Sequence, residues 1–435
     1  LGDVYKRQYL DSNHLIPSDD VDWVDEILRA AVVQSYNLSF TKADKKSNQL
    51  FSLGYYDQQG LVKFSDFKRV SGRFNSEYKL FDDHLRIGEN ISLSHSWGTS
   101  VSNNAALGGT LYEAYKFQSI TPVKNLEDEY AGNVFSDIPN PMGKLYRNKD
   151  NQDKKSRLVG NLYAELHLFD GLMFKTSFGV DYNNLYRRSF SPKYDELNAS
   201  EKLSSLSNRN AWNFNWVFTN TLTYNKTFGD HTINALLGME SLRNRYEYFT
   251  ASRDGFPSDD PNFRFLDAGD VGTQKNSGAA TEYSMVSYFG KLDYNYHDRY
   301  LVAFTLRRDG SSRLGNNKWG NFPSVSVGWR FSDEKFMKFS KKFLEDGKIR
   351  VSYGITGNEA IGNYDYIYSY SPNSIYDGVG GVIPTRIGKD NLKWEETKQF
   401  NLGLDLNFWN SRLTITADYY DKYTDGLLAN YQLPK

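Results

Sequence analysis

The connections between the strand-like segments of this chain alternate between short and long along the sequence. The short connections lie at 80–85, 169–171, 228–230, 297–299 and 409–411, and long polar loops lie near 98–156, 184–210, 248–280 and 357–395. An outer-membrane β-barrel has this asymmetry, because its periplasmic turns are short and its extracellular loops are long. The pattern therefore predicts an all-β fold, a transmembrane antiparallel β-barrel.

The composition excludes several other classes of protein. The mean hydropathy of −0.64 and the absence of any run of about 18 apolar residues exclude a helical membrane protein. A β-barrel is compatible with this value, because its polar loops and polar lumen lower the mean hydropathy to that of a soluble protein. The net charge of −1 provides no basic surface for nucleic acid. The chain has no Cys, which removes disulfide, zinc-thiolate and Cys-nucleophile chemistry.

Period-2 alternation marks the individual strands. In residues 400–408, the apolar Phe400, Leu402, Leu404, Leu406 and Phe408 alternate with the small or polar Asn401, Gly403, Asp405 and Asn407. A small, polar second face suits a water-filled or plugged lumen better than a packed core. Counting such segments gives about 14 strands, each near the length that a tilted strand needs to span a bilayer. We place them at 34–41, 49–57, 67–79, 85–98, 157–169, 172–187, 212–228, 231–248, 281–297, 300–309, 320–332, 348–357, 395–408 and 412–424.

Two segments have helical rather than strand periodicity. Residues 20–31 begin with acidic capping residues and repeat apolar side chains at helical spacing. Residues 333–344 place three Phe side chains on one side, with Asp333 as the predicted N-cap. Many apolar faces also end in Tyr or Trp, which predicts aromatic girdles at the two membrane interfaces.

The sequence contains no recognisable catalytic, cofactor or metal motif. None of the six His pairs with another at metal-ligand spacing, and no phosphate-binding glycine motif follows a strand. We therefore predict a protein that is not an enzyme and needs no cofactor. The remaining candidates for substrate binding are aromatic residues in or near long loops, namely Trp319, Tyr364, Tyr366 and Trp394. Flat rings beside polar groups suit sugars or extended peptides, although the same rings could equally pack loop against loop.

Several long motifs, in order, resemble one family. Residues 307–338, "RRDGSSRLGNNKWGNFPSVSVGWRFSDEKFMK", are similar to the central barrel of SusC/RagA-type TonB-linked outer-membrane proteins, and so are residues 350–366 and 391–428. The segment "IPNPMG" at 138–143 also matches, as do residues 22–41, where the family's barrel begins. The resemblance covers nearly the whole chain after Gln8.

The resemblance implies a barrel of roughly 22 strands around a plug in the outer membrane of a Gram-negative bacterium. It also implies three partners: a SusD-like surface lipoprotein, the TonB–ExbB–ExbD complex, and outer-membrane lipid. The implied activity is TonB-dependent import of large nutrients, above all oligosaccharides. Alternatives are a siderophore, vitamin or oligopeptide receptor of the same architecture, a passive porin, or a soluble secreted β-rich adhesin or lectin.

The ends of the chain suggest an internal fragment of such a barrel. We expect residues 1–8 to be a sequencing-adapter artefact, residues 9–33 to lead into the barrel with a short helix, and residues 34–435 to form the barrel wall, incomplete at its C-terminus. The plug and the TonB-binding segment would be missing, along with roughly eight strands. An incomplete barrel cannot close, so we expect an open, curled sheet with two unpaired edges.

Overall fold

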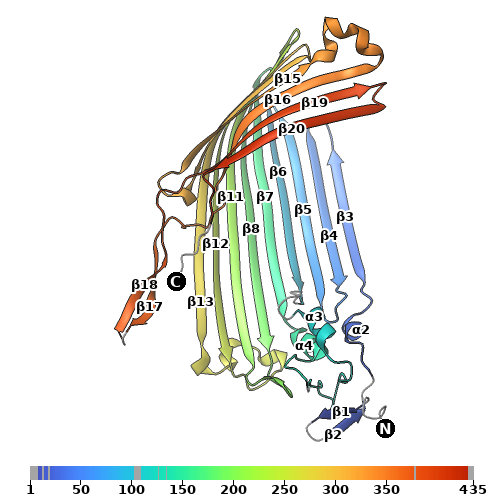
Figure 1. The fold of residues 1–435 in the computed structure, drawn as a ribbon, viewed down its shortest axis with the longest axis vertical. Helices are drawn as coiled ribbons and strands as arrows, with labels where there is room; N and C mark the ends of the chain where they lie inside the picture. Colours follow the sequence, from blue (N-terminus) through green and yellow to red (C-terminus); the bar gives the residue numbers. More distant parts are fainter. Residues whose placement is uncertain are drawn as a thin grey trace.

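A single large antiparallel sheet dominates the computed structural model, which describes residues 8–11, 14–17, 20–101, 109–125, 127–133, 135–376 and 379–429. The sheet has 14 strands in the order β20-β19-β16-β15-β14-β13-β12-β11-β8-β7-β6-β5-β4-β3. Apart from three small hairpins, neighbours in the sheet are therefore neighbours in the sequence. Figure 1 shows the sheet curling so that β16, β19 and β20 cross in front of the upper ends of earlier strands such as β8 and β11.

The predicted strands are all present. Their bounds are β3 Val33–Ala43, β4 Ser47–Gln59, β5 Asp66–Leu80, β6 Leu85–Gly98, β7 Gln152–Phe169, β8 Leu172–Ser191, β11 Ser205–Phe228, β12 His231–Asp254, β13 Lys275–Tyr296, β14 Tyr300–Ser311, β15 Trp319–Arg330, β16 Leu344–Asn358, β19 Glu395–Phe408 and β20 Leu413–Asp425. The small hairpins are β1 Gln8–Asp11 with β2 His14–Pro17, β9 Tyr194–Glu196 with β10 Ala199–Glu201, and β17 Ser369–Tyr376 with β18 Val379–Arg386.

The long and short connections lie at opposite ends of the sheet. The helical connection 331–343 and the tight turns lie at one end, and α2, α3, α4 and the β17–β18 hairpin lie at the other (Figure 1). The sheet stays open, with β3 and β20 at its two edges, as predicted for a partial barrel. Within the described residues, no helix is long and apolar enough to span a membrane.

Several strands extend further toward the loop end than their sequence pattern predicts. β11 and β12 each have 24 residues and pair along their whole length. Beyond the apolar belt, polar residues such as Asn208, Arg243 and Arg245 occupy positions in phase with the apolar face, so the period-2 signal disappears although the backbone ladder continues. The loops predicted at 184–210 and 248–280 therefore shrink to 192–204 and 255–274.

The helical predictions need correction. Residues 333–344 do not form an α-helix; they form the 3₁₀ helices η5 Phe331–Asp333 and η6 Lys335–Lys342, and Asp333 does not cap η6. Phe336 and Phe339 stay exposed, so little apolar surface is buried there to stabilise a regular helix. The first helix is short, α2 Trp23–Ile27, and Asp22 caps it by accepting the N–H of Val24 and Asp25. Two helices, α3 Thr110–Lys116 and α4 Pro141–Asn148, lie in a segment predicted as a loop.

The two faces of the sheet differ in the predicted way. One face, called here the apolar face, exposes large side chains such as Leu93, Leu162, Leu292, Phe304 and Leu402. The other, called the polar face, carries cross-strand ion pairs, for instance Arg157–Asp181 at 2.7 Å and Lys175–Glu165 at 2.9 Å.

Glu89 is an exception that the sequence reading did not anticipate. Its strand neighbours across the ladder are Ser76 and Leu162, which places it on the apolar face. The hydroxyl of the buried Ser76 donates a hydrogen bond to its carboxylate. This contact satisfies one lone pair of a charge in an apolar setting.

Candidate binding site at the loop end of the sheet

The loop end is organised around Asn140, which is fully buried and begins α4. Its Oδ1 accepts the N–H of Met142 and Gly143 at 3.0 and 3.1 Å, which caps the helix, and Pro141 occupies the first turn. Its Nδ2 donates to the carbonyls of Val123 and Ala131, both at 3.0 Å. One side chain thus joins the helix start to two distant points of the loop 99–151.

A small hydrophobic core fixes the three helices against one another. Trp23 and Ile27 of α2 pack with Ala114 of α3, Phe117, and Met142 and Leu145 of α4. The Trp23 indole donates to the carbonyl of Gln118 at 3.1 Å and meets the Phe117 ring edge to face at 4.6 Å. The segment before β3 and the loop after β6 therefore form one rigid unit at this end.

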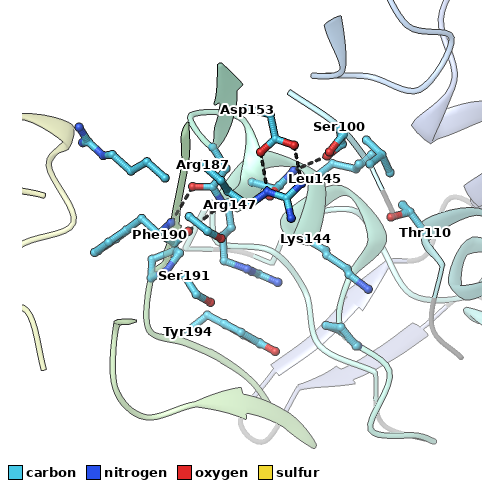
Figure 2. A pocket seen from close by; sticks show the side chains of 17 residues that line it. Ser100, Thr110, Lys144, Leu145, Arg147, Asp153, Arg187, Phe190, Ser191 and Tyr194 are labelled. Carbon is cyan, nitrogen blue, oxygen red and sulfur yellow. Dashed lines mark hydrogen bonds and ion pairs between the residues drawn. The ribbon is translucent and has the colours of Figure 1, made fainter. Parts of the chain in front are cut away.

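A cavity of about 600 Å³ lies between this unit and the ends of β7 and β8. Its lining comes from α4, from the end of β8 and from β9, and includes Arg147, Asp153, Arg187, Phe190 and Tyr194 (Figure 2). Its volume falls within the range of about 300–1,000 Å³ typical of small-molecule sites. We call it the rim cavity.

Ion pairs line the rim cavity. Arg187 and Asp153 are cross-strand partners, and their side chains meet through two contacts of 2.6 and 2.5 Å. Lys144 contacts the Glu113 carboxylate at 2.6 Å. These two cations each have a carboxylate partner, whereas Arg188, which also lines the cavity, donates to a backbone carbonyl at 3.3 Å. Among the described residues, the cavity therefore presents hydrogen-bonding groups and one guanidinium that no carboxylate contacts.

Glu196 links the loop 192–204 to α4 from an almost completely buried position. Its Oε1 accepts Arg147 Nη1 at 2.5 Å, and its Oε2 accepts the backbone N–H of Asn140 at 2.6 Å. Burial raises the pKa of Glu196, while Arg147 and the Asn140 amide offset part of this effect. The Arg147 guanidinium also lies over the Tyr194 ring, 3.8 Å from its centroid.

A second cavity of about 480 Å³ lies on the other side of the contact between Glu196 and Arg147, which we call the latch. It shares Arg147, Pro192 and Tyr194 with the rim cavity and is otherwise lined by residues such as Tyr130, Tyr146 and Arg264. The stacked Arg147 and Tyr194 side chains therefore form the partition between the two spaces.

The structure does not bring the four predicted aromatic residues together. Trp394 is buried, meets Phe322 edge to face at 5.1 Å, and donates its indole N–H to the carbonyl of Lys318 at 2.9 Å. Trp319 begins β15 on the apolar face, where it stacks on Tyr288 at 6.2 Å. These surroundings favour packing for Trp394 and an interfacial position for Trp319.

Tyr364 and Tyr366 do lie together, and they help to line another cavity of about 450 Å³ beside β13. The Tyr364 hydroxyl accepts the backbone N–H of Glu282 at 3.3 Å. A ligand-binding role for any of the four aromatic residues stays a prediction.

Sequence reasoning missed Arg147, Glu196 and Asn140 as parts of a site. The partners are 49 and 56 positions apart, and no periodicity connects them. The Asn140–Pro141 pair was the one local signal, because Asn followed by Pro is a common helix start.

Comparison with known proteins identifies the class. The family described as TonB dependent receptor-like, beta-barrel matches residues 3–435. The "TonB-dependent receptor P3" of Formosa agariphila is 33% identical over 99% of this chain and 43% of its own length. The "TonB-dependent receptor SusC" of Bacteroides thetaiotaomicron is 30% identical over 96% of this chain and 44% of its own length.

A solved structure shows the same architecture. The chain is similar to one described as "Structure of the RagAB peptide transporter", with a TM-score of 0.83, 26% identity, and coverage of 100% of this chain and 49% of that chain. The siderophore receptor PiuA of Acinetobacter baumannii, at 12% identity and a TM-score of 0.51, shares the fold alone.

The fold, the two-faced sheet and these matches define an outer-membrane β-barrel protein. The chain belongs to the TonB-dependent receptor-like β-barrel family and is of the SusC/RagA type. It spans about two-fifths of the length of the curated relatives that it matches. Its apolar face is thus the lipid-facing surface of the barrel, and the predicted soluble alternative is wrong.

Proposed function

We propose that the protein takes part in TonB-dependent import of large nutrients across the outer membrane, with oligosaccharides as the cargo. The division into a leading segment at 9–33 and a barrel wall at 34–435 belongs to the same proposal, as does energy supply from the TonB–ExbB–ExbD complex. The observation that carries the proposal is the rim cavity, which combines polar and apolar side chains, is of ligand size and lies at the loop end of the barrel.

The chemistry of the rim cavity suits a neutral, hydroxyl-rich ligand. Carboxylate oxygens of Asp153 and guanidinium groups of Arg147 and Arg187 can accept from and donate to sugar hydroxyls, and Tyr194 adds an aromatic ring. Three of the cations that line the cavity, Arg147, Arg187 and Lys144, are each held by a carboxylate, and Arg188 donates to the carbonyl of Pro261 instead. An anionic cargo, such as many iron chelates, would gain more from cations without such partners.

An oligopeptide is the second candidate cargo, favoured by one specific observation. The structure described as the RagAB peptide transporter matches 100% of this chain, over 49% of its own length, at a TM-score of 0.83. The barrel wall by itself does not distinguish the two cargoes, because both need a wide polar lumen.

We also propose that a SusD-like lipoprotein covers the loop end. Beside the rim cavity, α3 exposes Leu111 and Tyr112 and leaves Tyr115 82% exposed. Apolar side chains gathered at one place on a water-exposed end are typical of a docking surface.

The test is uptake by cells that carry the complete gene. Cells should accumulate a fluorescent oligosaccharide in a TonB-dependent manner, and Asp153→Asn should reduce binding of that sugar while Asp260→Asn, in the exposed loop 255–274, should not. A complete protein that takes up labelled peptides and ignores every oligosaccharide of a broad panel would reject the glycan proposal in favour of the second candidate.

A further inference from the structure

β13 extends beyond its neighbour β14 at the loop end. It pairs with β12 from Lys275 to Tyr296, whereas its pairing with β14 begins only at Met285, opposite Ser311. Residues 275–284 therefore have a strand on one side only, and residues 275–280 are all exposed. Because β12, β13 and β14 are consecutive in the chain, completing the barrel elsewhere does not cover this edge.

The backbone groups that face the open side can be identified from two contacts. The N–H of Ser284 donates to Ser312 Oγ at 3.0 Å, and the N–H of Glu282 donates to the Tyr364 hydroxyl at 3.3 Å. Backbone groups alternate sides along an antiparallel strand. The N–H and C=O of Ala280, Gly278 and Asn276 consequently point to the same open side.

The two hydroxyls continue the line of β14. Ser312 Oγ and the Tyr364 hydroxyl accept from the edge amides in the way that the carbonyls of a neighbouring strand would, and Asn363 Nδ2 donates to Thr281 Oγ1 at 2.9 Å. These side-chain groups take the place of a neighbouring strand only as far as Thr281. Among the hydrogen bonds between described residues, none reaches the backbone of residues 276, 278 and 280 from the open side.

The edge lacks the features that normally prevent strand addition. Such edges are usually blocked by Pro, by a bulge, or by charged side chains, but the register with β12 is regular and residues 277–280 are Ser, Gly, Ala and Ala. The one charge, Lys275, lies at the end of the stretch and contacts Asp254 at 3.1 Å. Small side chains leave both faces free for the side chains of an added strand.

We propose that residues 276–280 of β13 bind a free oligopeptide by β-strand addition. A polypeptide backbone offers alternating donors and acceptors at strand spacing, and this is what the open edge complements. A strand added along about five residues buries far less surface than the roughly 1,200 Å² of a stable protein–protein interface. The edge therefore suits transient capture of a peptide rather than a permanent subunit. The inference does not depend on the oligosaccharide proposal, since the rim cavity lies elsewhere.

The experiment uses the full-length protein purified in detergent. The probe is a fluorescent, end-blocked octapeptide of alternating Thr and Val, and its fully N-methylated analogue, which has no N–H donor, is the comparison. Ala280→Pro removes one open-side N–H, which a free strand edge tolerates; Ser277→Ala alters a side chain and no edge amide. Binding is followed by fluorescence anisotropy, and backbone exposure by hydrogen exchange.

We expect the plain peptide to bind, to slow exchange at residues 276, 278 and 280, and to bind at least tenfold more weakly to Ala280→Pro but normally to Ser277→Ala. Equal binding of the plain and N-methylated peptides would overturn the proposal, and this comparison needs no variant to fold. Slow exchange at these three residues before any peptide is added would also overturn it, because another part of the chain would then cover the edge. Failure of oligosaccharide uptake would leave these readouts unchanged.

Discussion

Replacing Glu196 with Gln tests whether one buried carboxylate holds the loop end together. The substitution keeps the shape of the side chain and removes the charge that Arg147 contacts at 2.5 Å. A hydrogen bond to a charged partner is worth about 1.5–3 kcal/mol, and the 2% exposure of the Glu196 side chain leaves little water to replace it. The free energy of local opening around α4 should therefore fall by about this amount.

Hydrogen exchange on the full-length protein measures this opening. At about 1.4 kcal/mol per factor of ten, amides of α4 should exchange roughly 10- to 150-fold faster in Glu196→Gln. Met142 and Gly143 are the informative positions, because their N–H groups reach Asn140 Oδ1 and Asn140 is itself held by Glu196. Amides in the middle of β11 serve as the internal control and should not change.

The pair with Arg147 gives a sharper criterion. Because Arg147→Met already removes the cation, adding Glu196→Gln to it should cost less than Glu196→Gln alone. Strictly additive effects of the two substitutions would refute the claim that the contact between Glu196 and Arg147 holds α4 in place. Exchange at Met142 in Glu196→Gln that stays within about twofold of the wild type would refute it as well.

Three further predictions concern the barrel wall and its turns. Leu404→Arg should prevent heat-modifiable gel migration of the full-length protein, because a lipid-facing Arg costs about 2–4 kcal/mol at mid-membrane, whereas Asp405→Asn on the polar face should fold; folding of both would contradict the face assignment. Since the chain has no Cys, Asn262→Cys should be labelled on intact cells by an impermeant maleimide and Asp230→Cys should not, and the opposite result would invert the topology. The backbone amides of Lys46 and Ser47 lower the pKa of Asp44. The turn between β3 and β4 should therefore be most stable above the ordinary pKa of 3.8 and should loosen as the pH falls through the lowered value. Hydrogen exchange in the turn, followed against pH, should show this dependence in the wild type and not in Asp44→Asn.

Asp405 illustrates what the structure adds to an argument from the sequence. The alternation in 400–408 places its side chain on the polar face, which suggests that even Arg could replace it there. The structure shows that Arg350 contacts this carboxylate at 2.6 and 3.0 Å and also reaches Asp418 at 3.0 Å. An Arg at 405 would face Arg350, so the neutral Asn is the appropriate control.

The strands could be predicted because lipid imposes a period on the sequence. Each lipid-facing position must be apolar and each lumen-facing position can be polar, so strands such as β19 are readable from their own residues. The rim cavity follows no such rule. Arg147 and Glu196 meet because α4 and the loop 192–204 pack against each other, and a contact between segments 49 residues apart leaves no local pattern.

The position of Trp319 in the fold could have been predicted from the sequence. The odd-numbered residues Val325, Val327 and Trp329 lie on the apolar face of β15, and counting back in steps of two from Val325 reaches Trp319. A strand keeps this phase as long as its ladder stays regular, and the pairing of β15 with β14 has no shift from Trp319 to Trp329. Extending the count past the last clearly alternating residue would have placed the indole at the membrane interface rather than in a loop. The same count cannot place Trp394, because it lies outside the ladder, one residue before β19 begins.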